Sequence, residues 1–364
     1  MAAHDCESHK VAVFPSEKVL RLEGKDGAVT KVVTDKRELN AQLVIFAAGF
    51  IPNGQIAKEA GLDVAPFGAI VVDEHMRTSD PAIYAGGDCA AIKNIITGKV
   101  GYLPLGSMAN RQGRVIGTNL AGGNAKFPGY VGSWAVKVFD LSFCGVGLTV
   151  DRARKEGFDA MSVGVEQLDH AHFYPEKSMM SLELVVDKAT SRVLGMQGAC
   201  ADPDSLKARV DAVAAALQYS KPTVEDISNL EVAYAPPFAS AMDVVNVVAN
   251  VAENALAGRF TPVTGDQFID LWEKRGENHV FFIDARPAAA GKAVQAKHPD
   301  WHAIPLEEIA ARVAEVPKAR PVAIICNTGL RAYDSLLVLA RNGITDVVNS
   351  NGGMQSVIKM GLSV

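Results

Sequence analysis

The stretch Ala323–Ala332, AIICNTGLRA, is an apolar run that ends in a cysteine and passes into a helical pattern a few residues later. The run is typical of a buried strand, and the helix is expected to begin near Arg331. In open α/β sheets, ligands bind beyond the carboxyl ends of the strands. We therefore expect Cys326 to lie at the reactive edge of a sheet.

The loop from Cys326 to Arg331 is short and contains Gly329. Such a loop can turn successive backbone amides inward as an anion-binding nest, and the following helix adds its positive N-terminal end. Both effects favour thiolate, so we expect a lowered pKa for Cys326. Arg331 stays charged and could hold an anionic group or brace the loop. The alternative is a buried cysteine that only packs as a small hydrophobic side chain. The position of Cys326 in the sequence does not by itself distinguish a reactive cysteine from a packing one.

The overall composition excludes several classes of protein. The 364 residues are 48% hydrophobic and 21% charged, which indicates a globular chain of two to three domains. The net charge of −5 lacks the basic bias of nucleic-acid-binding proteins. No apolar run approaches the ~18 residues of a membrane span, and the N-terminus has no signal-peptide core. We expect no nucleic-acid or membrane partner and a cytoplasmic location.

Cysteine and histidine spacing predicts no metal site. The five scattered cysteines argue against a disulfide framework and a thiolate metal centre; they are Cys6, Cys89, Cys144, Cys200 and Cys326. His170 and His172 lie two residues apart, and we expect them to share one strand face as solvated side chains.

Hydrophobic periodicity predicts strands and helices along the whole chain. Expected strands, in order, lie at 10–14, 18–24, 28–34, 43–53, 68–79, 81–91, 133–149, 160–167 and 179–198, with a hairpin turn at Asp26-Gly27. Expected helices lie at 107–120, 206–219 and 240–256. From residue 265 on, strands and helices alternate, which indicates a parallel sheet with helices on its faces.

Residues 265–364 resemble a rhodanese domain. FIDAR, with Asp284 and Arg286, is similar to the first strand of that family, and Cys326-x-x-Gly329-x-Arg331 to its active-site loop. DVVNSNGGM is similar to its closing strand and glycine turn (Gly352, Gly353). The loop has the length used by sulfurtransferases. The resemblance implies that Cys326 carries a sulfane sulfur as a persulfide. The segment departs from the rhodanese pattern at one place, where the family's glycine-histidine-isoleucine signature is replaced by GKAVQAKHPDWHAIPL. This difference bears on how a substrate reaches the cysteine.

Three stretches of the N-terminal third, LVIFAAGFIPN, TSDPAIYAGGDCAA and GYLPLGSMANRQGRVIGTNLAGG, resemble pyridine nucleotide-disulfide oxidoreductases in content and order. Taken by itself, Asp88 after two glycines fits a turn or helix-cap aspartate as well as a hydroxyl-binding one. The resemblance implies FAD and NAD(P)H, with Asp88 on the flavin ribityl chain. Residues expected to border the isoalloxazine ring are Pro104, Leu105, Ser107, Ala109, Asn110 and Arg111.

Residues 130–258 resemble the dimerisation domain of that family. FYPEK, with Tyr174, and AYAPPF, with Tyr234, are similar to the subgroup that reduces coenzyme A disulfide or persulfide, often with a C-terminal rhodanese domain. In that subgroup the two tyrosines reach the partner subunit's active site, so the resemblance implies a homodimer and coenzyme A-type thiol or persulfide substrates. Ordinary interface or core packing is the alternative for both residues.

The chain departs from the oxidoreductase pattern at its start. It contains no G-x-G-x-x-G, and Cys6 does not correspond to the family's early redox cysteine. We expect a truncated or diverged remnant in which the flavin pyrophosphate lacks its helix N-terminus, so that flavin binds weakly or not at all.

The expected fold is α/β and α+β in three parts. Residues 1–125 would be a remnant of the NAD(P)- and FAD-binding domains, 126–258 a dimerisation domain, and 264–364 a parallel-sheet rhodanese domain. Three functions compete: a flavin-dependent NAD(P)H:coenzyme A-disulfide or persulfide reductase fused to a sulfurtransferase, a stand-alone sulfurtransferase without flavin, and a non-catalytic dimerising remnant.

Overall fold

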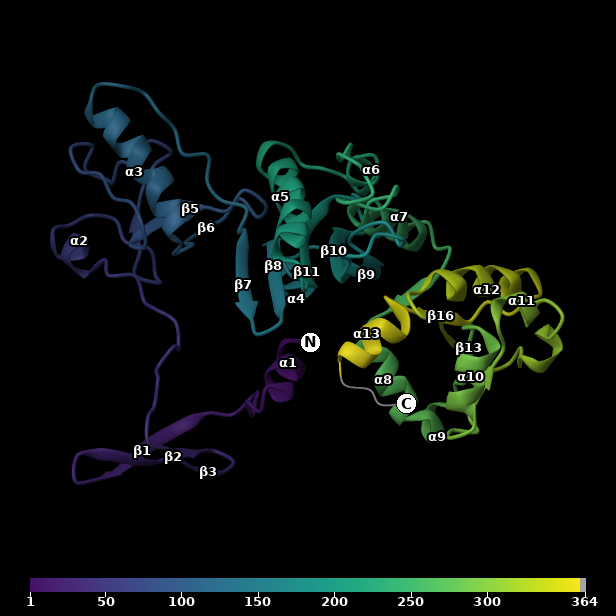
Figure 1. Cartoon of the computed structure of the whole chain (residues 1–364). Helices are drawn as coiled ribbons and strands as arrows, with labels where there is room; N and C mark the ends of the chain where they lie inside the picture. Colours follow the sequence, from purple (N-terminus) through teal and green to yellow (C-terminus); the bar gives the residue numbers. More distant parts are fainter. Residues whose placement is uncertain (361–364) are drawn as a thin grey trace. The chain divides into compact units, whose positions relative to one another are not determined.

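The computed structural model describes residues 1–360, which form two compact units (Figure 1). Unit 1 contains residues 1–5, 93–99 and the chain from Gly129 on; unit 2 contains Cys6–Ile92 and Val100–Pro128. Among the described residues, none of the helices has both the length and the apolar character that a bilayer crossing requires.

Unit 2 holds two small sheets and one long helix. The elements up to residue 120 are α1 (Ala2–Ser8), β1 (Val19–Lys25), β2 (Ala28–Thr34), β3 (Glu38–Asn40), α2 (Gln55–Glu59), β4 (Ile70–Val71), β5 (Ala90–Lys93), β6 (Val100–Gly101) and α3 (Gly106–Leu120). The strands β1, β2 and β3 pair antiparallel. The hairpin predicted at Asp26-Gly27 is confirmed: both residues have positive φ, 52° and 81°, as a two-residue type I′ turn requires.

The strand predicted over 43–53 is wrong. The segment is irregular, and its apolar side chains are exposed, Leu43 at 77%, Ile45 at 81% and Phe46 at 74%. A buried strand exists only with hydrogen-bonded neighbours, and no strand among residues 1–360 pairs with this one. The apolar composition of 43–53 fits a buried strand, but the described residues provide no neighbouring strand to pair with it.

Three other strand predictions in unit 2 are wrong or too long. Residues 10–14 form no strand. Of 68–79 only Ile70–Val71 belongs to a strand, and of 81–91 only the last two residues, where β5 begins; Arg77 and Tyr84 add an isolated bridge between the two runs. Turns at Asp73 and Asp80, whose side chains accept backbone amides two residues on, break these runs.

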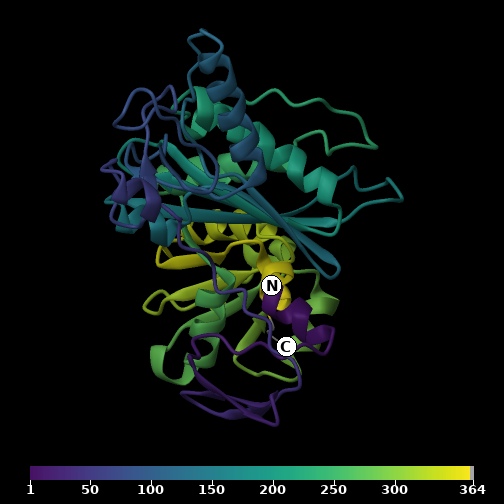
Figure 2. The ribbon, with the colours of Figure 1, turned by 90° about the vertical axis from the view of Figure 1, so that its left-hand side faces the viewer.

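The central sheet of unit 1 has five antiparallel strands in the order β7-β8-β11-β10-β9. Its elements are β7 (Trp134–Val138), β8 (Leu141–Gly147), α4 (Val150–Lys155), β9 (Ala160–Leu168), β10 (Met179–Asp187), β11 (Val193–Cys200), α5 (Pro203–Tyr219), α6 (Val224–Ser228) and α7 (Val244–Leu256). The long strands run side by side in Figure 2. Helix α5 contacts β8 and β11, and α7 contacts β9 and β10. The β segments predicted here are confirmed, but 133–149 and 179–198 each contain two strands rather than one.

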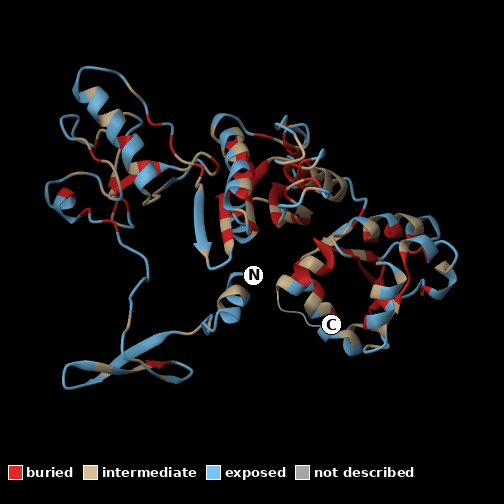
Figure 3. Cartoon of the chain, viewed as in Figure 1, coloured by how far each residue is buried: buried red, intermediate tan, exposed pale blue. Residues whose placement is uncertain are grey.

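The helix predicted at 240–256 begins only at Val244, because Asp243 caps it through the amide of Val245. The apolar face of α5 packs against β8 and β11 and is not exposed for contact with a partner subunit. Its residues Leu206, Val210 and Val213 are buried in the core of the central sheet. By contrast, β7 is exposed along most of its length, which Figure 3 shows in pale blue.

The C-terminal sheet has five strands in the order β12-β16-β15-β13-β14, all parallel in their pairings. Its elements are β12 (Thr261–Val263), α8 (Gly265–Glu273), α9 (Arg275–Asn278), β13 (Phe281–Asp284), α10 (Ala288–Gln295), β14 (Trp301–Ala303), α11 (Leu306–Ile309), η1 (Val313–Glu315), β15 (Val322–Ile325), α12 (Leu330–Arg341), β16 (Val347–Ser350) and α13 (Gly353–Lys359). This confirms the predicted alternation. The buried strands β13 and β15 lie at the centre of the sheet, and the loop after β15 carries Cys326.

Candidate active site at the Cys326 loop

Cys326 lies directly after the buried strand β15 and is itself only 2% exposed. Its Sγ accepts a hydrogen bond from the amide of Gly329 at 3.1 Å. Gly329 has φ 104°, which favours glycine, and it precedes the first turn of α12. The amide of the N-cap residue of α12 therefore donates directly to the sulfur.

The glycine turn at residues 352 and 353 holds this loop in place. The amide of Met354 donates to Cys326 O at 2.8 Å, and the amide of Gln355 donates to Asn327 O at 3.1 Å. Gly353 has φ 59°, and a Cβ there would lie 2.3 Å from Cys326 O. Only glycine fits both the conformation and the contact, so the shape of the cysteine loop depends on this turn.

The acidic residue and arginine of FIDAR brace the neighbouring strand. The Asp284 side chain is fully buried and accepts from Arg286 Nη2 at 2.7 Å and from Trp301 Nε1 at 2.9 Å. Arg331 is 42% exposed, and its Nη1 lies 3.9 Å from Glu307 Oε1 on α11. Of the two roles considered for Arg331, this contact favours bracing the loop.

A cavity of about 900 Å³ opens over the cysteine loop, within unit 1. The loop contributes Asn327 to Leu330, and α7 contributes Asn250 and Asn254 across from them. Phe173 and Tyr234 add aromatic surface. The cavity has the size of a small-molecule pocket, with an apolar lining and a few amide groups.

The two tyrosines singled out in the sequence have different surroundings. Tyr234 lines the 900 Å³ cavity and is 52% exposed. Tyr174 instead stacks on the His170 ring, with ring centroids 5.8 Å apart. Tyr234 thus shares a cavity with the Cys326 loop, whereas Tyr174 belongs to a polar cluster at the end of β9. His170 and His172 follow that strand and do not share a strand face, contrary to expectation.

In unit 2 the loop of Asp88 lies against α3. The amide of Gly87 donates to Gln112 Oε1 at 2.6 Å, and a Cβ on Gly87 would meet Ala109 Cβ at 3.6 Å. Asp88 is exposed. The structure therefore brings Asp88 near the helix that carries Ser107, Ala109, Asn110 and Arg111, with Pro104 and Leu105 just before it.

These residues fit only one side of a flavin site. Asn110 Nδ2 donates to Gly106 O, and Arg111 lies over the Phe127 ring at 5.3 Å, so both side chains are used within unit 2. The sequence has no G-x-G-x-x-G turn to receive the pyrophosphate. The residues present do not make a complete FAD site.

Sequence reasoning missed several residues that the structure makes prominent. Asn250 and Asn254 lie one turn apart on α7, a spacing that predicts a shared face but not a cavity. Gln112 is 1% exposed, and because it stands in the polar run Asn110–Arg114 the sequence gave no signal of its burial or of its contact with Gly87.

Three family models match the chain in sequence order. Residues 1–113 match the pyridine nucleotide-disulphide oxidoreductase model, 134–245 the dimerisation domain of that family, and 268–360 the rhodanese-like domain. The chain belongs to the pyridine nucleotide-disulphide oxidoreductase family and carries a rhodanese-like domain after the dimerisation domain.

Relatives and solved structures agree with this assignment. An NAD(P)H sulfur oxidoreductase (CoA-dependent) of Pyrococcus abyssi is 41% identical over 235 residues, 65% of this chain and 52% of that protein. An NAD-dependent persulfide reductase from A. fulgidus is 34% identical with a TM-score of 0.87, covering 97% of this chain and 62% of that one. An FAD-dependent pyridine nucleotide-disulphide oxidoreductase from Desulfovibrio vulgaris is 58% identical with a TM-score of 0.62, covering 70% and 59%. The chain spans about half the length of the curated relatives it matches.

Proposed function

We propose that this protein handles sulfane sulfur, as an FAD-dependent NAD(P)H:coenzyme A-disulfide or persulfide reductase joined to a sulfurtransferase whose carrier is Cys326. The observation that carries the proposal is the cysteine loop: the Gly329 amide donates to Sγ, and the loop forms one wall of the 900 Å³ cavity. The names of the relatives, a CoA-dependent sulfur oxidoreductase and a persulfide reductase, support sulfane sulfur compounds as the substrate class.

The sulfur-transfer step needs only residues of this chain. The Cys326 thiolate attacks the outer sulfur of a donor such as thiosulfate, the S–S bond of the donor breaks, and sulfite leaves with the electron pair. The enzyme then carries a persulfide. An acceptor thiolate or cyanide attacks its terminal sulfur, and the Cys326 thiolate leaves. No external oxidant or reductant is consumed.

The Gly329 amide stabilises the leaving thiolate in the second half of this cycle. Arg331 keeps the loop shaped through Glu307, and Tyr234 borders the space where the acceptor binds. Tyr174 stacks on His170 after β9, and we propose that it acts at the partner subunit. We retain residues 1–125, 126–258 and 264–364 as proposed domain bounds, and propose that the protein forms a homodimer through the second of them.

Transfer of sulfur from thiosulfate to cyanide by the purified chain tests the proposal. Cys326→Ser removes the nucleophile with little change in volume, and we expect it to abolish thiocyanate formation while Cys6→Ser retains it. Substantial transfer by Cys326→Ser would show that another group is the carrier.

The reductase part rests on family membership and on Asp88 with the start of α3. NAD(P)H would supply the electrons, with FAD as the intermediate carrier. Because these residues form one side of a flavin site, we expect the 364-residue chain to bind FAD weakly. Stoichiometric flavin in the purified chain would contradict that. A cytoplasmic location is part of the proposal, since the cysteines are unpaired.

A further inference from the structure

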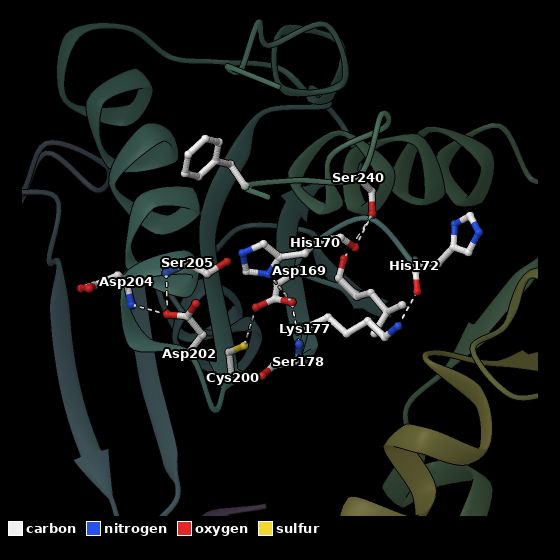
Figure 4. Close-up of polar contacts among 12 residues, drawn as sticks. Asp169, His170, His172, Lys177, Ser178, Cys200, Asp202, Asp204, Ser205 and Ser240 are labelled. Atoms are coloured by element: carbon white, nitrogen blue, oxygen red, sulfur yellow. Dashed lines mark hydrogen bonds and ion pairs between the residues drawn. The ribbon is translucent and has the colours of Figure 1, made fainter. Parts of the chain in front are cut away.

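Three side chains that bind metals well meet at one edge of the central sheet. Strands β9 and β11 both pair antiparallel with β10, so their carboxyl ends lie at the same edge. Asp169 and His170 follow β9, and Asp202 follows β11. One ligand atom from each lies within 4.8 Å of the others. Figure 4 shows the three side chains around one point.

Asp169 is a buried carboxylate with little to compensate its charge. Its side chain is fully buried; Oδ1 accepts the amide of Ser178 at 2.6 Å, and Oδ2 accepts from the Cys200 thiol at 3.9 Å. Within residues 1–360, no lysine or arginine side chain forms an ion pair with it. His170 Nδ1 lies 2.8 Å from Asp169 Oδ1 but makes no hydrogen bond there. A buried carboxylate is stable when it is paired or coordinates a metal. The imidazole is the basic group beside Asp169, and a divalent ion among the three side chains would supply more positive charge than the imidazole can.

The nearest guanidinium does not fill that role. Arg209 is committed to Asp243, with Nη2 2.7 Å from Oδ2, and it meets Asp169 only at the backbone oxygen, at 3.2 Å. A cavity of about 460 Å³ adjoins the cluster and is lined by His170, Asp202 and Arg209, among others. The cavity gives an ion a path to the site and room for a bound water.

We propose that Asp169, His170 and Asp202 form a site for a divalent transition-metal ion, Zn²⁺ by its donor set. The ligands are Asp169 Oδ1, His170 Nδ1 and Asp202 Oδ2, with water from the cavity in the fourth position. One nitrogen and two carboxylate oxygens with an open position suit Zn²⁺. Asp202 Oδ1 caps α5 through the amides of Asp204 and Ser205 at 3.0 and 3.2 Å, which leaves Oδ2 as its oxygen without a backbone donor.

The ion fixes the segment from Asp169 to Ser178. Tyr174 lies within this segment and stacks on His170, so the ion orders the ring as well. The proposal departs from the expectation of no metal site. His170 and Asp202 are far apart in the sequence and show no ligand spacing, and only the pairing of both strands with β10 brings them together.

Calorimetric titration of ZnCl₂ into the chelator-treated full chain tests the site. All proteins carry Cys326→Ser, which removes that thiolate as a competing ligand. The variants are His170→Ala and Asp202→Asn; the asparagine keeps an oxygen to cap α5. His172→Ala, two residues away and exposed, is the matched control. Circular dichroism checks folding, and thermal unfolding with and without zinc gives a second readout.

We expect one Zn²⁺ per chain, a melting temperature raised by zinc, and unchanged binding in His172→Ala. His170→Ala and Asp202→Asn should each lower the zinc affinity by more than about tenfold. Loss of a residue that only supports a metal ligand already costs about that much, and loss of a ligand should cost more. Absence of stoichiometric binding would overturn the proposal. Full zinc affinity in either folded variant, or an equal loss in His172→Ala, would also overturn it.

Discussion

Lys359 Nζ lies 2.6 Å from Glu166 Oε2, and this contact joins α13 of the rhodanese-like domain to β9 of the central sheet. Ser181 donates to the other carboxylate oxygen at 2.6 Å, and Lys359 also donates to Ser181 Oγ at 2.9 Å. The Glu166 side chain is 2% exposed. Both of its oxygens have partners, so loss of the lysine would leave a buried charge.

We predict that Lys359→Met lowers the free energy of unfolding by about 3 kcal/mol, the low end for a broken buried pair, because Lys359 is partly exposed. Adding Glu166→Gln should recover part of the loss, since the stranded charge is removed. Lys274→Met, which removes an exposed pair with Asp270, is the control and should have little effect on stability. Urea titration of the full chain measures all of these; equal losses in Lys359→Met and Lys274→Met would refute the prediction.

Gly353→Ala should destroy the cysteine loop. The added Cβ meets Cys326 O at 2.3 Å in a backbone conformation of φ 59°. We expect a more than tenfold loss of sulfur transfer. Gly343→Ala separates backbone strain from the steric clash. Its φ is also positive, 80°, but its Cβ would meet nothing closer than Lys318 Nζ at 3.9 Å. It should cost about 1 kcal/mol of stability and no activity. Similar sulfur-transfer rates in the two variants would contradict the role assigned to the glycine turn.

The 900 Å³ cavity should be needed for bulky sulfur acceptors and not for small ones. Asn250→Trp places an indole on α7 opposite the cysteine loop. We predict that KM rises for a bulky acceptor thiol such as coenzyme A, while the rate with cyanide stays near that of the parent protein. Steady-state kinetics with both acceptors, in parallel with Asn250→Ala, measure the difference. An equal effect of the indole on both acceptors would mean that the cavity is not the acceptor site.

The dimer prediction rests on the exposed face of β7, which lies within the predicted dimerisation domain. On β7, Trp134 is 41% and Val136 50% exposed, an apolar face at the edge of the central sheet. We expect light scattering to give a dimer mass at micromolar concentration, and Val136→Asp to shift it toward the monomer. Leu20→Asp, on an exposed strand of unit 2, is the control and should have no effect. A monomeric parent protein would remove the interface.

The sequence predicted those elements whose stability is set locally or by one sheet. The Asp26-Gly27 turn follows from its own backbone preferences, and the alternating pattern after residue 265 reflects a sheet whose strands are all present. The segment at 43–53 shows the opposite case. Its composition is that of a buried strand, but burial depends on neighbours, and without them it is exposed.

The candidate site likewise contains residues that the sequence predicted and residues that it did not. Cys326, Gly329 and Gly353 come from contiguous motifs, and the structure brings them together through backbone hydrogen bonds. Asn250 and the Asp169–His170–Asp202 cluster depend on strand and helix packing between distant positions, which periodicity does not encode. Tyr174 and Tyr234 looked alike in the sequence and occupy different surroundings.

The carrier role of Cys326 is tested most directly by mass spectrometry of the full chain after incubation with thiosulfate and removal of excess donor. The account predicts one added sulfur atom, located on the peptide that contains Cys326, lost on addition of cyanide and absent from Cys326→Ser. Sulfur retained by Cys326→Ser, or found on a different cysteine of the parent protein, would contradict it.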